Sequence, residues 1–328
     1  MRRLLPIFVG VFLTSGVWLP DSQAQGLPTY EDFRQVDRVR RMTGQLQTAE
    51  LLRVTQIDSG LIERVAQQAT NDYQAIWGAA ELIGNWPAKH RLFESALTSS
   101  GTNLEVALRY ACAAAANRDS DTAFPLLHLV EKDDSANIIP WFVEMKLLST
   151  SEPKGLADLK PPPSWAIRYH DYAADAARAR IHTLEAGGYS PYAARRLGFM
   201  PDTPVLTMAR DCAEKPIEKA GVPLLLTVAH AMEDRPLYLV TELVGQSLER
   251  ATIRVGAKDQ TSPEVSLRSV ELDQRRDEIK ALLSAVERNI VDIATESEMI
   301  QYFNNVLSIG EEAAMRRLAE TVQRHPLP

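Results

Sequence analysis

The chain has 328 residues, of which 45% are hydrophobic and 24% are charged, and its formal net charge at pH 7 is −7. A chain of this length and composition builds a core of its own, in one elongated domain or in two compact ones. Its mildly acidic balance argues against a nucleic-acid partner, because nucleic-acid binding usually requires a basic face.

The first 24 residues have the three regions of a secretory signal peptide. The pair Arg2-Arg3 precedes an apolar run from Leu4 to Pro20, and the small-x-small site Ser22-Gln23-Ala24 follows. We therefore expect residues 1–24 to be a signal peptide that is cleaved between Ala24 and Gln25. The mature chain would then be exported, to the periplasm or outside the cell. The alternative is an uncleaved membrane anchor, for which the run is short because a spanning helix needs about 20 apolar residues.

The rest of the chain lacks the motifs of the common catalytic classes. No later stretch approaches the roughly 18 apolar residues of a membrane span, so none is expected after signal cleavage. The nucleotide-binding patterns GxxxxGK followed by Ser or Thr and GxGxxG are absent, as are HExxH and GxSxG. The sequence therefore assigns no catalytic, cofactor-binding or metal-binding residue, and it favours a binding protein over an enzyme.

Cys112 and Cys212 are the two cysteines of the chain. Export permits a disulfide between them. However, Cys112 lies in the alanine-rich stretch 110–116, which is typical of a closely packed helix face, where a free cysteine behaves as a small hydrophobe. We favour two buried thiols over a Cys112–Cys212 bridge, because a chain of this length can build its core without a crosslink.

Helical periodicity and helix-end signals run through almost the whole mature chain. Helix starts are predicted where a capping residue precedes a proline, at Ser190-Pro191, Thr203-Pro204 and Asp234-Arg235-Pro236. The best alternating stretch, Thr252 to Val255, is only four residues long, and we interpret it as the end of a helix or a loop. The predicted fold class is all-α.

Two polar stretches that contain proline divide the mature chain, at Ser149–Ser164 and Gly256–Pro263. The segments that they separate are a helical-repeat segment at 29–148, a helical segment at 164–255 and, at 264–325, a long helix followed by a helical end. The two stretches are either linkers between domains or long turns within one solenoid, and the sequence leaves both open.

A 34-residue register can be laid over residues 70–141. Small and large residues that would pack antiparallel helices take equivalent places in two successive units: Tyr73, Ile76, Trp77 and Ala80, then Ala107, Tyr110, Ala111 and Ala114. One further period from Ala107 reaches Trp141. The pattern resembles a degenerate tetratricopeptide repeat. The resemblance implies antiparallel helix pairs stacked as an α-solenoid, with a concave face that binds a peptide or a protein, and the alternative is an irregular helical bundle.

Histidines that lie near carboxylates are the candidates for an enzyme site. His170 and Asp171 are predicted on the same helix as Asp175, His182 and Glu185. Of these, His182 and Glu185 share one helix face, because they are three residues apart. Solvated or capping roles are favoured for all five side chains over a metal site.

A further histidine, His230, ends the apolar stretch 222–229 and is followed by Glu233. A histidine beside carboxylates can act as a general base. A histidine in the last turn of a helix also complements the helix dipole, and we favour this second interpretation.

Apolar residues recur every seven positions near the C-terminal end: Val265, Leu272, Ile279, Val286 and Ile293. The companion positions in the first half of this stripe hold Arg268 and Arg275, where a coiled coil requires apolar side chains. We therefore predict one long helix that docks on its own domain, with self-association through residues 265–293 as the alternative.

The function favoured by these patterns is that of an exported helical-repeat protein that binds a protein or peptide partner in the cell envelope. One alternative is an envelope enzyme whose site is assembled from distant His, Asp and Glu residues. The other is a structural oligomer formed through the helix at 265–293. An enzyme would bring the candidate histidines and carboxylates together in one pocket with perturbed pKa values.

Overall fold

The computed structural model describes residues 26–43, 54–151, 162–199, 204–214, 222–234, 236–256, 263–290 and 293–323. These residues form fifteen α-helices and contain no β-strand, so the all-α prediction is confirmed. None of the helices within these ranges is long and apolar enough to cross a membrane. The signal peptide 1–24, its cleavage point between Ala24 and Gln25 and most of the two polar stretches lie outside the described residues.

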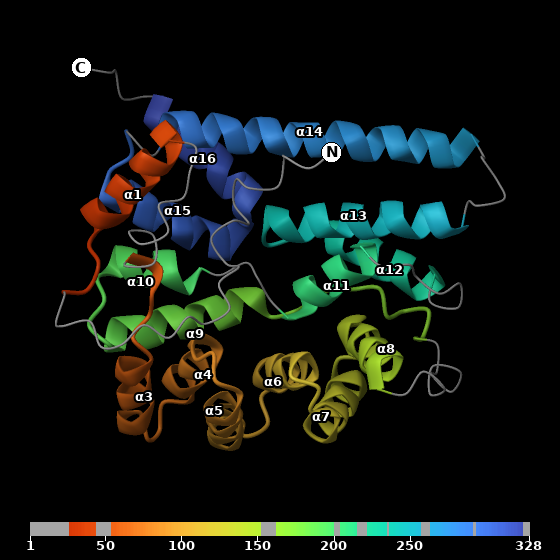
Figure 1. Ribbon diagram of the computed structural model, residues 1–328, viewed down its shortest axis with the longest axis horizontal. Coiled ribbons are helices and arrows are strands. Elements are labelled where there is room, and N and C mark those ends of the chain that lie inside the picture. The colour runs from red at the N-terminus through yellow and green to blue at the C-terminus, as the bar shows by residue number, and fades with distance from the viewer. Residues whose placement is uncertain are drawn as a thin grey trace.

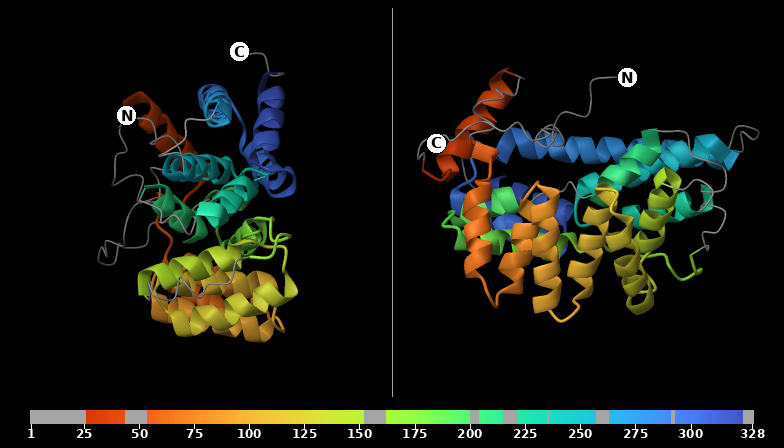
Figure 2. Two further views of the ribbon diagram at one scale, coloured as in Figure 1. Left: turned by 90° about the vertical axis from the view of Figure 1, so that its right-hand side faces the viewer. Right: turned by 60° about the horizontal axis from the view of Figure 1, so that its bottom comes forward.

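Six helices stand side by side in chain order and form a row (Figures 1 and 2). They are α3 (Ser59–Gln68), α4 (Tyr73–Leu82), α5 (Trp86–Ser99), α6 (Leu104–Ala116), α7 (Ser120–Asp133) and α8 (Ile139–Ser151). Each helix packs against the next one along the chain. Short polar side chains fix the start of α3 to α7, because each accepts a backbone N–H of the first turn: Asp58, Asp72, Asn85, Asn103 and Asp119.

Helix α9 (Ala173–Ala186) lies across this row and contacts α3, α4 and α6 (Figure 1). Small residues permit the close approach, since Gly78 of α4 faces the backbone of Ala179. The hydroxyl of Thr183 donates a hydrogen bond to the carbonyl oxygen of Ala75 at 2.9 Å. One face of the row is therefore covered by the chain itself.

A buried ion cluster joins α4, α6 and α9. The carboxylate of Glu81 accepts two hydrogen bonds from Arg109, at 2.7 and 2.6 Å, and a third from Arg180 at 3.3 Å. Arg180 also donates through Nε to the carbonyl oxygen of Gly198 at 2.7 Å. All three charged side chains are less than 10% exposed. The cluster therefore lies in the protein interior and fixes the positions of α4, α6 and α9 relative to one another.

Five further helices follow α9 along the chain: α10 (Pro191–Gly198), α11 (Pro204–Glu214), α12 (Val222–Glu233), α13 (Leu239–Gly256) and α14 (Pro263–Ile290). Of these, α11 contacts α6 and α8 of the row, and α12 contacts α8. α10 begins as predicted, with Ser190 accepting the N–H of Ala193 at 3.2 Å. α11 begins at the predicted Pro204. The residues Thr252 to Val255 lie in the last turns of α13, in agreement with their interpretation as a helix end.

The helix start predicted at Asp234-Arg235-Pro236 is wrong. α13 begins at Leu239, and Asp234 lies just after α12. The reason is a capping group that is distant in sequence: the carboxylate of Glu311 accepts the N–H of Leu239 at 2.7 Å. A long-range cap of this kind replaces the local one that the sequence pattern suggests.

The N-terminal helix α1 (Tyr30–Thr43) packs on α10, where the rings of Tyr30 and Phe33 meet the ring of Tyr192 edge-on. α15 (Glu296–Ile309) and α16 (Glu311–Gln323) pack on each other, and they contact α10 and α14, respectively. The hydroxyl of Tyr30 donates to the carbonyl oxygen of Ala294 at 2.6 Å. Phe33, Leu184 and Val306 belong to one hydrophobic core cluster. The segments predicted at 29–148, 164–255 and 264–325 therefore share this core.

The long helix expected near the C-terminal end is present as α14, which lies along α13 (Figure 1). Leu272, Ile279 and Val286 of its apolar stripe are buried. Ile293 lies beyond the end of the helix. These three positions of the stripe are therefore covered by the chain itself. Among the side chains of this helix that the structure describes, the large apolar ones that stay exposed are Leu267 and Val270.

Candidate functional site

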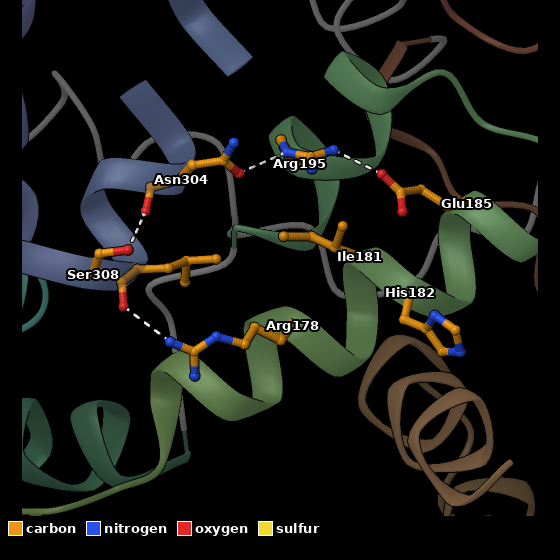
Figure 3. Close-up of a pocket in the computed structure, with 8 residues that line it drawn as sticks. Arg178, Ile181, His182, Glu185, Arg195, Asn304 and Ser308 are labelled. Atoms are coloured by element: carbon orange, nitrogen blue, oxygen red, sulfur yellow. Dashed lines mark hydrogen bonds and ion pairs between the residues drawn. The ribbon is translucent and has the colours of Figure 1, made fainter. Parts of the chain in front are cut away.

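A polar cleft opens where α9, α10 and α15 meet (Figure 3). Its volume is about 290 Å³, at the lower end of the size of small-ligand sites. This is room for a small polar group or for one or two side chains of a partner. The lining residues are Arg178, Ile181, His182, Glu185, Arg195, Asn304, Leu307 and Ser308.

Helical spacing accounts for the convergence of these side chains. The four lining residues of α9 begin at Arg178 and follow at i+3, i+4 and i+7, which places them on one face of the helix. The three lining residues of α15 begin at Asn304 and follow at i+3 and i+4. After α9, the turn at Gly187-Gly188, where Gly188 has a φ of 88°, reverses the chain, so that Arg195 of α10 lies over Glu185.

Arg195 is the central donor of the cleft. Its guanidinium pairs with Glu185 at 2.7 Å and donates through Nε to the side-chain oxygen of Asn304 at 3.0 Å (Figure 3). It also donates to the carbonyl oxygen of Pro191 at 2.9 Å. These contacts fix the guanidinium plane while 19% of the side chain remains exposed.

The other two basic side chains of the cleft also have carboxylate partners. Arg178 pairs with Asp175 and donates to the carbonyl oxygen of Leu307 at 3.0 Å. His182 lies 2.6 Å from a carboxylate oxygen of Asp72, the residue that caps α4. Arg178 and His182 are about half exposed. The cleft is therefore close to charge-balanced, with oriented donors that solvent can reach.

The hydroxyl and the imidazole of the cleft each have a partner in the protein. Ser308 is the hydroxyl of the cleft, and it donates to the backbone oxygen of Asn304 at 2.9 Å instead of to a base. His182 is engaged with Asp72. Among the described lining residues, no nucleophile lies within hydrogen-bonding distance of a general base, the pairing that covalent catalysis requires.

His170 and Asp171 do not lie on α9, and this part of the prediction is wrong. They belong to an extended segment that ends where the helix begins at Ala173. The segment is held by Asn137, whose side-chain amide donates to the carbonyl oxygen of His170 at 2.8 Å. Asp171 instead accepts the backbone N–H of Ala173, the first residue of α9, at 3.1 Å. Burial lowers the pKa of His170, and nearby Arg168 adds to the effect.

His230 lies in the last turn of α12, as predicted, and has a different set of partners. Its Nε2 is 3.1 Å from Glu249 of α13. Arg268 of α14 holds the same carboxylate through two contacts of 2.9 Å, and it reaches Glu233 at 2.9 Å. Among the described residues, no hydrogen bond or ion pair joins any two of His170, His182 and His230. Of the candidates from the sequence, His182 and Glu185 line the cleft.

A second arginine of α14 repeats this arrangement one heptad later. Arg275 pairs with Glu242 of α13, at 2.6 and 3.0 Å, and with Glu312 of α16 at 2.6 Å. The two arginines that interrupt the heptad stripe therefore link α14 to α12, α13 and α16, in addition to the buried apolar residues of the stripe. Bidentate arginine–carboxylate pairs supply direction as well as attraction.

The carboxyl group of Glu233 is expected to make stability depend on pH. Burial raises its pKa to about 8, and the nearby Glu249 carboxylate adds to the shift. Because the pKa is raised in the folded protein, protonated Glu233 adds to the free energy of unfolding. This stabilisation is fully present below the unfolded-state pKa of 4.5 and is lost as the pH rises through 8. Glu233→Gln should therefore match the wild type near pH 4.5 and exceed its stability at pH 8.5, by about 1 kcal/mol after solvent screening.

Thermal unfolding of both proteins across this pH range tests the expectation. Glu271→Gln is the matched control, because Glu271 contacts the same Arg268 at 3.3 Å but is 64% exposed. This control should show no difference from the wild type that grows with pH. A Glu233→Gln protein that is equal to or less stable than the wild type at pH 8.5 would contradict the assignment.

Cys112 and Cys212 are both buried, and in the part of the chain that the structure describes they form no disulfide. Burial raises the pKa of Cys112 to about 12. A thiol in this environment is not a ready nucleophile, because the thiolate is the reactive form.

Comparison of the chain with protein-family models, with curated proteins and with solved structures gave no match in any of the three. The functional inference therefore depends on the geometry of the chain itself. The sequence indicated two of the cleft residues, His182 and Glu185. It missed Arg195 and Asn304, because their side chains meet across 109 residues of sequence and carry no local motif.

Proposed function

We propose that this protein is an exported helical-repeat protein that binds a protein or peptide partner in the cell envelope, through a surface that includes the cleft between α9, α10 and α15. Export is inferred from the Arg2-Arg3 pair, the apolar run and the small-residue site before Gln25. The partner is inferred from the polar, solvent-accessible donors of the cleft, which are the single observation that carries the proposal.

The row α3–α8 is proposed to be an α-solenoid of tetratricopeptide-like pairs. In support, the equivalent residues of the 34-residue register, Tyr73, Ala107 and Trp141, lie in α4, α6 and α8. Ala107 and Trp141 are buried, and Tyr73 is half-buried against the core. Consecutive helices of the row pack against one another. Stacked helix pairs of this kind usually present a binding surface for protein segments.

The face of the row beneath α9 is not open to a partner, because α9 contacts α3, α4 and α6 along it. The cleft lies on the other side of α9, where Arg178 and Arg195 are fixed by internal contacts and still reach solvent. Fixed guanidinium groups bind carbonyl and carboxylate oxygens well. The partner segment is therefore expected to supply such acceptors to the cleft.

Site-directed photocrosslinking in native envelopes tests this function. A photoreactive amino acid at Ser308, an exposed lining position, should give a reproducible crosslinked partner. The same amino acid at Thr98, an exposed position on α5, is the control and should not capture that partner. With the partner purified, Arg195→Ala should weaken binding by roughly tenfold, which is the loss of about one strong hydrogen-bonded contact.

Two results would overturn the proposal. The first is the absence of any reproducible partner at Ser308. The second is a partner that is captured equally from Ser308 and Thr98 and that binds Arg195→Ala as tightly as the wild type. Turnover of an envelope substrate by the purified protein would favour the enzyme alternative instead.

A further inference from the structure

A second group of polar side chains lies outside the cleft, between α7 and α8 at the end of the helical row. His128 and Glu131 are three residues apart on α7, and Glu144 faces them from α8. One imidazole nitrogen and one oxygen from each carboxylate all lie within 4.8 Å of one another. The group is thus assembled from two helices, and the sequence, which lacks any metal-binding motif, did not indicate it.

The three side chains are held at this place by the packing of α7 on α8. Leu127 and Val130 of α7 and Phe142 of α8 are fully buried beside the group. The ring of His128 stacks against Phe124, one turn earlier, with centroids 6.4 Å apart. The imidazole is 60% exposed, whereas the Glu144 side chain is only 20% exposed. The site is therefore open to an ion from solvent on the histidine side.

His128 and Glu144 do not satisfy each other directly. Their closest atoms, Nε2 and Oε1, are 4.0 Å apart, which is the outer limit of an ion pair and too long for a hydrogen bond. A tetrahedral zinc site with bonds of about 2.0–2.1 Å separates its donor atoms by about 3.3 Å. Donor atoms that lie 4.0 to 4.8 Å apart must therefore approach by about 0.7 to 1.5 Å, which rotation of the imidazole and of the two carboxylate side chains would supply.

We propose that His128, Glu131 and Glu144 bind a Zn²⁺ ion that ties α7 to α8, with water completing the coordination. The donor set selects this class of ion, because imidazole suits zinc and related transition metals, whereas sites for Ca²⁺ and Mg²⁺ are built from oxygen alone. Three protein ligands and an open fourth position form a common zinc arrangement.

Zinc titration of the mature protein, after removal of metal with a chelator, tests the site. Isothermal titration should give one saturable site, and Zn²⁺ should raise the midpoint of thermal unfolding, because the ion binds the folded state. His128→Ala and Glu144→Gln should each weaken zinc binding by roughly tenfold or more and abolish the thermal shift. Circular dichroism of each variant checks that the helical fold is retained.

The matched control is Glu94→Gln. His90 and Glu94 form a histidine–glutamate pair at 3.5 Å on α5, but His90 is already hydrogen-bonded to Tyr110 at 2.8 Å. This variant should bind zinc as the wild type does. Absence of saturable zinc binding by the wild type would overturn the proposal, and so would equal affinity in the wild type, His128→Ala and Glu144→Gln.

Discussion

Replacement of Glu81 by glutamine is expected to lower the free energy of unfolding by about 3–5 kcal/mol, the usual loss when one member of a buried ion cluster is removed. The variant keeps the shape of the side chain but leaves Arg109 and Arg180 without their anion in the interior, where each is 3% exposed. Because an isolated buried charge is costly, the loss should exceed that of any surface substitution.

The ionisation of Glu81 supports the same magnitude. Burial alone would raise its pKa, but the guanidinium groups of Arg109 and Arg180 lower it from 4.5 to about 2. A shift of this size corresponds to roughly 3 kcal/mol. The stabilisation is present above the unfolded-state pKa of 4.5 and is lost as the pH falls through 2, so acid should reduce the difference between the wild type and the variant.

Denaturant unfolding at neutral pH measures the effect, since the transition midpoint should move while its slope stays the same. Glu94→Gln is the matched control, because Glu94 is 60% exposed on α5 and should change stability by less than about 0.5 kcal/mol. A Glu81→Gln protein within 1 kcal/mol or so of the wild type would show that the cluster contributes little net stability.

Replacement of Gly78 by alanine is expected to destabilise the protein by about 3 kcal/mol or more. A Cβ at this position would lie 2.1 Å from the backbone oxygen of Ala179 and 2.2 Å from the hydroxyl oxygen of Thr183. Backbone atoms cannot rotate away, so α9 would have to move off α4. The higher helix propensity of alanine, worth about 1 kcal/mol, is too small to compensate.

Gly84→Ala provides the comparison. Gly84 follows α4, and nothing lies within 4 Å of a Cβ placed there. This variant should be as stable as the wild type or slightly more so, because alanine restricts the unfolded chain. Equal stability of Gly78→Ala and Gly84→Ala in thermal or denaturant unfolding would mean that α4 and α9 do not approach as closely as the structure describes.

The cleft and the His128–Glu131–Glu144 group each combine side chains that are neighbours on one helix with side chains that only the packing of helices brings near. His182 and Glu185 could be placed on one face because they are three residues apart on a helix. Arg195 and Asn304 complete the cleft only through the turn at Gly188 and the docking of α15. Glu144 likewise reaches His128 only because α7 and α8 are adjacent. A single sequence carries no signal for such pairings.

The sequence by itself determined the helical class, the start of α10 after Ser190 and the presence of one long helix near the C-terminal end, because helix periodicity and capping are local properties. Only the tertiary structure decided that α9 crosses α4 at Gly78 and that Glu311 starts α13 in place of the local cap. It also decided that Arg268 attaches α14 to α13. The physical reason is that such contacts join residues far apart in the chain, and their energy depends on burial and distance, which exist only once the helices have packed.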